Sequence, residues 1–187
     1  EMRAMGKVMR DHSIHTAMKD QIAMLASNRK ENSVIPDMNI LENMYLSEHT
    51  LSAWKPAISK KKEAERYKKY KEMLNIKANS WEDPITSLSG GNQQKVIFGK
   101  WLERSPNIFM MDDPTRGIDV GAKYEIYELI INMAKQGKTI IVVSSEMPEI
   151  LGITNRIGVM SNGRLAGIVN TKETNQEELL RLSAKYL

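Results

Sequence analysis

The chain has 187 residues, of which 41% are hydrophobic and 27% are charged, and its formal net charge is +4. These values are typical of a water-soluble globular protein with one domain, or with one domain and a subdomain. The absence of cysteine excludes disulfides, a thiolate metal site and a cysteine nucleophile. No apolar run approaches the roughly 18 residues that a membrane-spanning helix needs.

Residues 1 to about 35 give weak signals, and from 36 to about 105 the signals are helical. Four apolar residues have the spacing of one helix face: Ala17, Met18, Ile22 and Leu25. Asn39 and Glu42 are spaced as the two halves of a capping box, which predicts a helix beginning there. Ser59 predicts the cap of a second, long helix. A further helix is expected from Gly91 or Asn92 to about residue 103, after a loop at 81–87.

The long helix carries a basic stretch, with lysines at 60–62, 68, 69 and 71 among the acidic residues Glu63, Glu65 and Glu72. One interpretation is a patch for nucleic acid or for an anionic membrane. The favoured interpretation is a solvated helix face with ion pairs along the helix itself.

Strand and helix signals alternate after Pro106. The predicted elements, in chain order, are a strand over 107–111, a helix over 120–136 capped by Asp119 and ended by Gly137, a strand over 139–143, a short helix over 148–151, a hairpin formed by 157–160 and 165–169, and a last helix with a capping box of Thr174 and Glu177. Apolar and polar residues do not alternate along the strand at 139–143, which predicts that this strand is buried on both faces.

Two motifs carry the chemistry. Residues 88–94 read Leu-Ser-Gly-Gly-Asn-Gln-Gln, and a Ser-Gly-Gly ahead of a helix offers a hydroxyl and bare N–H groups to phosphate oxygens. The apolar run 108–111 ends in Asp112 and Asp113, where the Mg²⁺ of a nucleotide would be held. The chain contains no Gly-x-x-x-x-Gly-Lys-Ser/Thr loop. The sequence therefore predicts one half of a phosphate site and lacks the other.

Residues 88–94 resemble the signature motif of ATP-binding-cassette (ABC) ATPases, and residues 111–119 resemble that family's Walker B segment and D-loop. The signature variant that ends in Asn-Gln-Gln-Lys, the run Asp-Pro-Thr-Arg-Gly-Ile-Asp-Val-Gly-Ala-Lys and the run Ser-Ser-Glu-Met-Pro-Glu are similar to one branch. That branch is the tandem-cassette ATPases of bacterial monosaccharide importers, and the similarity is to their second cassette. The segment 151–163 most resembles the ATPases that import galactose and methylgalactoside.

The resemblance implies a role for each matching residue. In this family two cassettes face each other, and each ATP lies between the lysine loop of one cassette and the signature of the other. The residues implied in binding ATP are Ser89, Gly90, Gly91, Asn92, Gln93 and Asp119. Asp112 is implied in holding Mg²⁺. Asp119 is also expected to bridge the interface between cassettes.

The implied catalytic positions depart from the family pattern. Asp113 stands where the family carries a general-base glutamate, and its side chain is one methylene shorter. Glu146 stands where active cassettes carry a histidine that contacts the γ-phosphate, a replacement that second cassettes of this branch share. We therefore expect this half to complete a partner's ATP site, and the chain alone to hydrolyse little ATP.

The resemblance implies an α/β fold with an incomplete ABC-ATPase core of the P-loop NTPase type and an inserted helical subdomain. The expected divisions are a remnant of the nucleotide-binding core without the lysine loop (1–35), the helical subdomain that ends in the signature (36–105), and the α/β core with Walker B, D-loop and C-terminal hairpin (106–187). The sequence is expected to be part of a longer protein.

The implied function is ATP-driven import of a monosaccharide at the cytoplasmic face of a bacterial inner membrane. The implied partners are an N-terminal cassette, transmembrane permease subunits and a periplasmic or lipid-anchored sugar-binding protein, with no nucleic acid. Two alternatives remain open: a truncated cassette without catalytic activity, and an ABC ATPase that acts on nucleic acid or ribosomes instead of transport.

Overall fold

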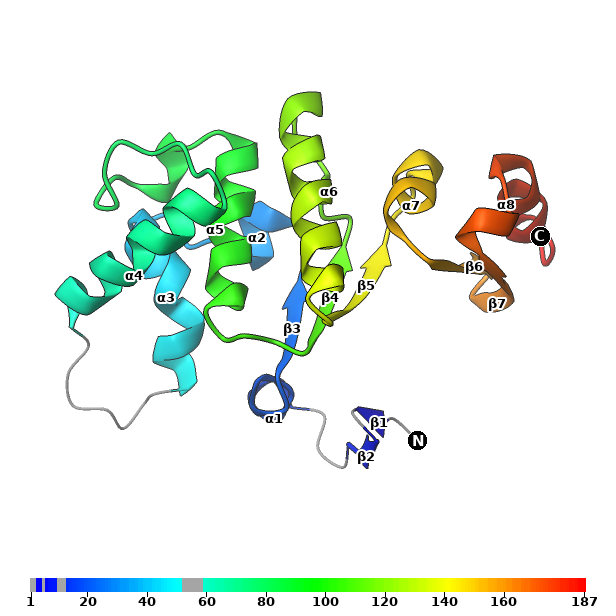
Figure 1. The fold of residues 1–187 in the computed structure, drawn as a ribbon, viewed down its shortest axis with the longest axis horizontal. Coiled ribbons are helices and arrows are strands. Elements are labelled where there is room, and N and C mark those ends of the chain that lie inside the picture. Colours follow the sequence, from blue (N-terminus) through cyan, green and yellow to red (C-terminus); the bar gives the residue numbers. More distant parts are fainter. Residues whose placement is uncertain (1–2, 5, 10–12, 52–58) are drawn as a thin grey trace. The chain divides into compact units, whose positions relative to one another are not determined.

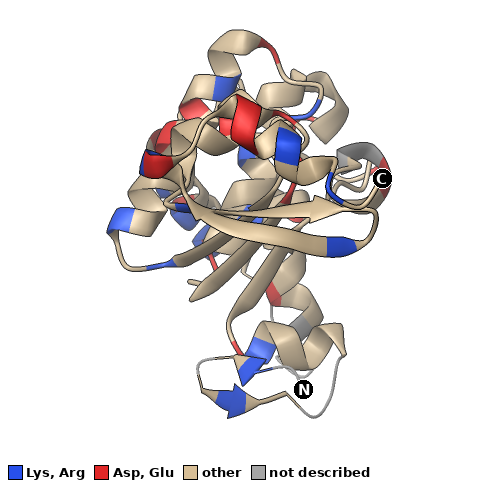
Figure 2. Cartoon of the chain, turned by 90° about the vertical axis from the view of Figure 1, so that its right-hand side faces the viewer, with Lys and Arg blue, Asp and Glu red and all other residues tan. Residues whose placement is uncertain are grey.

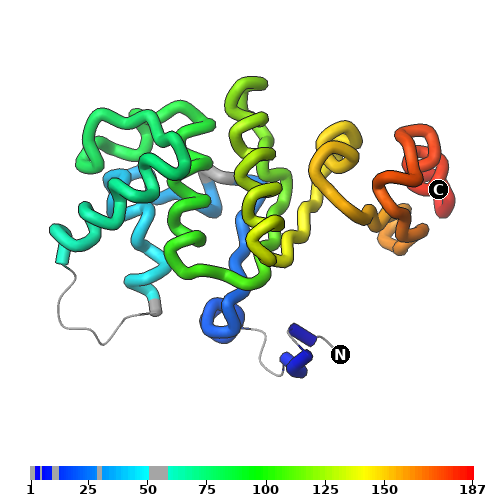
Figure 3. The backbone as a smooth tube through the Cα atoms, viewed as in Figure 1, coloured from blue at the N-terminus to red at the C-terminus, as the bar shows by residue number. Residues whose placement is uncertain are grey.

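The computed structural model describes residues 3–4, 6–9, 13–51 and 59–187, apart from the side chains of residues 29, 30 and 51. The chain divides into two compact units, 1–141 and 142–187, which are described separately below. Figures 1 and 3 show the course of the chain through each unit. Within the described residues, no helix is long and apolar enough to span a bilayer.

The first unit contains most of the elements. In chain order they are β1 (Arg3–Ala4), β2 (Lys7–Val8), α1 (Ile14–Lys19), β3 (Ile22–Leu25), α2 (Arg29–Asn32), α3 (Ile40–Leu51), α4 (Lys60–Met73), the 3-10 turn η1 (Ile85–Ser87), α5 (Gly90–Leu102), β4 (Ile108–Asp112), α6 (Val120–Lys135) and β5 (Thr139–Val143), whose last two residues belong to the second unit.

The three strands β3, β4 and β5 form one sheet, in the order β3-β4-β5. β3 and β4 are parallel, with Ile22 opposite Ile108 and Leu25 opposite Met111. The helical spacing predicted through Ile22 and Leu25 is therefore wrong. Pairing with a strand far along the sequence outweighs the local periodicity, which a four-residue apolar segment cannot decide. The strands of this sheet carry one charged residue, Asp112, whereas charges of both signs lie on the helices (Figure 2).

The expectation that β5 is buried on both faces is also wrong. β5 lies at an edge of the sheet, and its residues alternate between exposed and half-buried. Ile141 and Val143 are 46% and 59% exposed, and Met24 and Met110, which pair in register on the neighbouring strands, are exposed as well. One face of this sheet is therefore not covered by the described residues of the first unit.

The helical part of the unit is positioned by its caps and by α5. The predicted capping box is confirmed, because Asn39 Oδ1 accepts from the Glu42 amide at 2.8 Å and Glu42 Oε2 accepts from the Asn39 amide at 3.1 Å. Ser59 caps α4, as predicted. α5 packs against α3 on one side and against the sheet on the other, where the rings of Phe98 and Phe109 meet edge to face at 5.7 Å. This packing positions α5 between α3 and the sheet.

The basic stretch on α4 is solvent-exposed at its first three lysines, as predicted. Its ion pairs differ from the prediction. Within the described residues, α4 pairs with neighbouring helices instead of along its own length: Glu63 contacts His49 of α3, and Arg66 contacts Glu48 of α3 and Glu103 at the end of α5. The ion pairs of α4 therefore connect this helix to α3 and to the end of α5.

The second unit is a hairpin packed against two helices. Its elements are α7 (Met147–Ile153), β6 (Arg156–Ser161), β7 (Arg164–Asn170), the 3-10 turn η2 (Thr171–Glu173) and α8 (Gln176–Ser183). Ile150, Ile157, Val159 and Leu179 form its buried core. The antiparallel hairpin around Asn162 and Gly163 is confirmed. The predicted cap of the last helix is displaced by one residue, because the side chain of Asn175, not Thr174, accepts the amide of Glu178.

Candidate functional site

The signature segment forms the start of α5. Ser89 is its N-cap, and its hydroxyl accepts from the backbone amide of Asn92 at 3.4 Å and from the Asn92 side chain at 3.0 Å. Gln93 donates from its side chain to the Leu88 carbonyl at 3.0 Å. Gly90 and Gly91 occupy the first turn, whose N–H groups have no acceptor within the helix. The segment therefore presents a polar helix start with two amides available to an anion.

Two helix N-termini meet at this point. Asp119 is the N-cap of α6, and its Oδ1 accepts from the Ala122 amide at 3.0 Å. Residues at the starts of α5 and α6 together line a hollow of about 350 Å³. The residues that line it are Lys77, Ser89, Gly91, Asn92, Lys95, Asp119, Gly121, Ala122 and Glu125. The structure thus brings four of the predicted site residues to one place: Ser89, Gly91, Asn92 and Asp119.

Gly91 is required for the close approach of the two helices. A Cβ atom at this position would lie 2.7 Å from Cβ of Ala122 and 3.5 Å from Cγ2 of Ile118. A 2.7 Å carbon–carbon separation is far inside the ordinary contact distance. The absence of a side chain at Gly91 therefore allows the start of α5 to pack closely against α6.

Three side chains outside the predicted set of site residues hold the signature helix in place, although the quoted motif contains two of them, Gln94 and Lys95. Gln94, which is 3% exposed, donates to the carbonyl of Pro114 in the loop after β4, at 2.8 Å. Buried Lys95 donates to the Asn75 carbonyl at 2.8 Å and forms an ion pair with Glu125 of α6. The hydrogen bond from Lys95 holds the pKa of the Glu125 carboxyl below its usual value. The sequence signal for Gln94 and Lys95 was their place in the signature motif, whereas no motif indicated Glu125.

The charges of the hollow are balanced. Lys77 and Lys95 contribute two positive charges, and Asp119 and Glu125 contribute two negative charges. The backbone amide of Lys77 is tied to the signature by donating to Asn92 Oδ1 at 2.8 Å. Attraction for a phosphate would therefore come from the amides at the start of α5, not from a net positive charge.

Asp112 and Asp113 lie at the end of β4. Asp112 is its last residue and is partly exposed. Asp113 has φ = 44°, in the left-handed region, and its carbonyl accepts from the Arg116 amide at 3.1 Å. This turn leads toward Thr115, which is buried, and then to the cap of α6. Within the described residues, no group of three or more acidic or histidine side chains could hold a metal ion by itself.

Glu146 belongs to the second unit, where it precedes α7. Its amide donates to Ser144 Oγ at 3.0 Å, and its side chain does not cap the helix. The neighbouring buried carboxylate, Glu149, accepts a hydrogen bond from the Ser144 hydroxyl. Ser144 thus fixes the backbone at Glu146, whose side chain is exposed.

Comparison with known proteins identifies the class. The profile of the ABC transporter family matches residues 1–116, which is more than half of the chain. The chain therefore belongs to the ABC transporter family, as the signature and Walker B segments predicted.

Individual relatives are consistent with one branch. The galactose/methyl galactoside import ATP-binding protein MglA of Treponema denticola is 59% identical over 183 residues, which cover 97% of this chain and 36% of that protein. The protein of the same description from Treponema pallidum is 56% identical over 189 residues, which cover 38% of it, and that of Vibrio cholerae is 47% identical over 185 residues. The chain thus spans little more than a third of the length of these curated relatives.

Solved structures support the predicted fold. The ATP-binding cassette MJ0796, in a dimeric post-hydrolysis state bound to ADP and Pi, aligns with a TM-score of 0.72 at 22% identity, covering 89% of this chain and 69% of that one. The cassette MJ1267 aligns with a TM-score of 0.72 at 19% identity, covering 90% and 70%. The α/β fold is therefore a partial ABC-ATPase cassette of the P-loop NTPase type, as the sequence predicted.

Proposed function

We propose that this chain is part of the ATP-binding subunit of a bacterial monosaccharide importer, and that it supplies the signature half of an ATP site whose lysine loop belongs to another cassette. The single observation that carries the proposal is the hollow between the starts of α5 and α6, where Ser89, Gly91, Asn92 and Asp119 come together. The high identity to galactose/methyl galactoside import ATP-binding proteins supports the sugar-import setting.

The hollow suits the phosphate end of ATP. The amides of Gly90 and Gly91 are available at the start of a 13-residue helix, and no side chain at Gly91 blocks them. Gln93, which does not line the hollow, is also proposed to bind the nucleotide, on the resemblance of the signature motif alone. Lys77 and Lys95 offset the two carboxylates of the lining. A phosphate there would therefore meet donors without a net repulsive charge.

The Mg²⁺ side of the proposal depends on Asp112. Mg²⁺ in nucleotide sites is usually held by one or two carboxylates together with water and phosphate oxygens, so a site without a closed cage fits this ion. Asp112, at the end of β4, would be the protein ligand. Asp113 and Glu146 stand at the proposed catalytic positions, and the shorter Asp113 carboxylate is the reason we propose weak hydrolysis at this site.

The remaining parts of the proposal concern organisation. We propose the division into a core remnant (1–35), a helical subdomain (36–105) and an α/β core (106–187). The partners would be an N-terminal cassette, permease subunits and a sugar-binding protein, with the ATPase bound at the cytoplasmic face of the membrane.

The test measures ATP affinity and turnover of the chain alone and after addition of an N-terminal cassette. We expect little turnover by the chain alone and a clear increase in ATP affinity when both are present. Ser89→Arg should remove that increase, because the larger charged side chain enters the hollow. Ser87→Arg, at an exposed residue of the turn η1 two positions away, is the matched control and should retain the increase.

Two outcomes would contradict the proposal. One is turnover by the isolated chain at the rate of a complete transporter ATPase that Ser89→Arg leaves unchanged. The other is an equal loss in the Ser87→Arg control, which would indicate a general effect of added charge. Salt-dependent binding to mixed DNA or RNA would favour the alternative of an ABC ATPase that acts on nucleic acid.

A further inference from the structure

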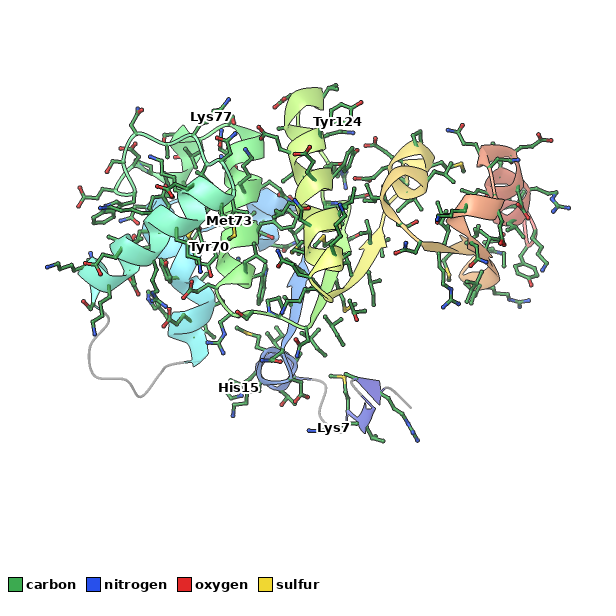
Figure 4. The ribbon with its side chains drawn as sticks, viewed as in Figure 1. Lys7, His15, Tyr70, Met73, Lys77 and Tyr124 are labelled. Atoms are coloured by element: carbon green, nitrogen blue, oxygen red, sulfur yellow. The ribbon has the colours of Figure 1, made fainter. Side chains whose placement is uncertain are left out.

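A second cavity, of about 500 Å³, lies within the first unit, at the opposite ends of the helices that form the signature hollow. One wall comes from the last turns of α4, the other from the last turns of α6, and the connection from α5 to β4 closes its base. Tyr70 and Met73 belong to the last turn of α4 (Figure 4). The apolar residues that line the cavity are Met73, Leu102, Phe109, Leu129, Met133 and Ile140.

The charged lining residues of this cavity all have the same sign. They are Lys69, Lys135 and Lys138, and no aspartate or glutamate lines the cavity. None of the ion pairs found within the described residues involves these three lysines. The cavity thus combines an apolar interior with a cationic border, and we call it the lysine-bordered cavity.

One of the three lysines already interacts with neighbouring groups. Glu103, which accepts a hydrogen bond from the Tyr70 hydroxyl, also interacts electrostatically with Lys69. The Lys69 Nζ atom lies 5.9 Å from the centre of the Tyr70 ring. Lys135 and Lys138, which form no ion pair within the described residues, therefore supply most of the positive charge that a ligand would meet.

We propose that the lysine-bordered cavity binds a small amphipathic anion, with a carboxylate or phosphate group at the lysines and an apolar body in the interior. Its volume lies in the range of small-molecule sites, roughly 300–1,000 Å³. An inorganic anion would leave this volume unfilled and Met73, which is 51% exposed, uncovered. A neutral apolar molecule would desolvate the lysines without compensating their charge. A ligand with both an anionic group and an apolar body would pair with the lysines and also cover the apolar residues of the cavity.

A simpler explanation for the lysines is that they balance the partial negative charge at the ends of α4 and α6. That role requires no ligand, and it makes a different prediction: no saturable binding in the cavity. The cavity and the signature hollow share no lining residue. They are therefore separate sites, and failure of one proposal leaves the other intact.

The methionines allow a direct test on the full 187-residue chain. With ¹³C-labelled methionine methyl groups, titration with decanoate should shift the signals of Met73 and Met133 saturably. Met24 on β3 and Met160 on β6 do not line the cavity and should not shift. Phenyl phosphate in a parallel titration distinguishes a phosphate head from a carboxylate head. Decanol and inorganic phosphate should each bind at least tenfold more weakly than the better of these two.

Charge reversal tests the role of the lysines. Lys135→Glu with Lys138→Glu should weaken decanoate binding at least tenfold, because one exposed ion pair changes affinity by up to about fivefold and reversal adds repulsion. The matched control, Lys61→Glu with Lys62→Glu, makes the same charge change on the exposed first turn of α4 and should stay within twofold. Leu129→Trp should fill the cavity and abolish binding, with near-ultraviolet circular dichroism confirming a folded chain.

The proposal is overturned if the signals of Met73 and Met133 do not shift saturably with decanoate or with phenyl phosphate. It is also overturned if decanol or inorganic phosphate binds as well as the amphipathic anions, or if the control pair weakens binding as much as the Lys135 and Lys138 reversal does.

Discussion

The contact between Gly91 and Ala122 allows a sharp test of how the signature helix is held. In Gly91→Ala, the new Cβ would lie 2.7 Å from Cβ of Ala122, an atom fixed to the backbone of α6. Because neither atom can rotate away, α5 and α6 must separate. Such overpacking typically costs about 1–3 kcal/mol. We expect the free energy of unfolding, measured by urea titration with tryptophan fluorescence, to fall by about this amount.

Gly99 offers a control in the same helix. A Cβ there would also meet an atom at 2.7 Å, but that atom is the terminal methyl of Met44, at the end of a flexible side chain. Alanine also stabilises a helix interior by about 1 kcal/mol relative to glycine. Gly99→Ala should therefore change the free energy of unfolding by less than about 1 kcal/mol in either direction.

A compensating substitution completes the test. Ala122→Gly removes the clashing atom and should itself cost about 1 kcal/mol through helix propensity. Combined with Gly91→Ala, it should restore most of the loss, so that the double variant is more stable than the sum of the single effects predicts. Additive effects, or equal losses for Gly91→Ala and Gly99→Ala, would refute the argument that this contact sets the helix spacing.

Three further predictions concern single contacts. Gln94→Leu should lower the free energy of unfolding by about 1–3 kcal/mol in urea, because the Pro114 carbonyl loses its buried donor; an unchanged value would contradict the importance of this bond. Asp119→Ala should cost about 1 kcal/mol by removing the cap of α6, and Asp119→Asn, which keeps the acceptor, should cost clearly less in the same assay. Burial lowers the pKa of Lys100 from 10.5 to about 8, so between these values the unfolded chain binds more protons and stability at this site rises with pH. The stability of the wild type relative to Lys100→Met should therefore increase from pH 7.5 to 9.5, and a decrease would contradict the lowered pKa.

Several parts of the fold were predictable because they depend on residues close together in the sequence. Asn39 and Glu42 cap α3 across three residues, and Ser89 and Asp119 cap α5 and α6 in the same way. The hairpin around Asn162 depends on a two-residue turn. Predictions failed where distant residues decide, as at Ile22, whose strand pairs with β4, and at Ile141, whose exposure depends on what covers the sheet.

The sequence by itself determined the family, through the ordered signature and Walker B motifs, and the boundaries of most helices. Only the tertiary structure decided that Gly91 permits the contact with Ala122, that Gln94 binds the loop after β4, and that lysines from α4 and α6 border one cavity. The reason is physical. Caps and turns are formed by hydrogen bonds between near neighbours, which a pattern of residue types encodes directly. Packing contacts join residues far apart in the chain, and their distances are set only when the helices meet.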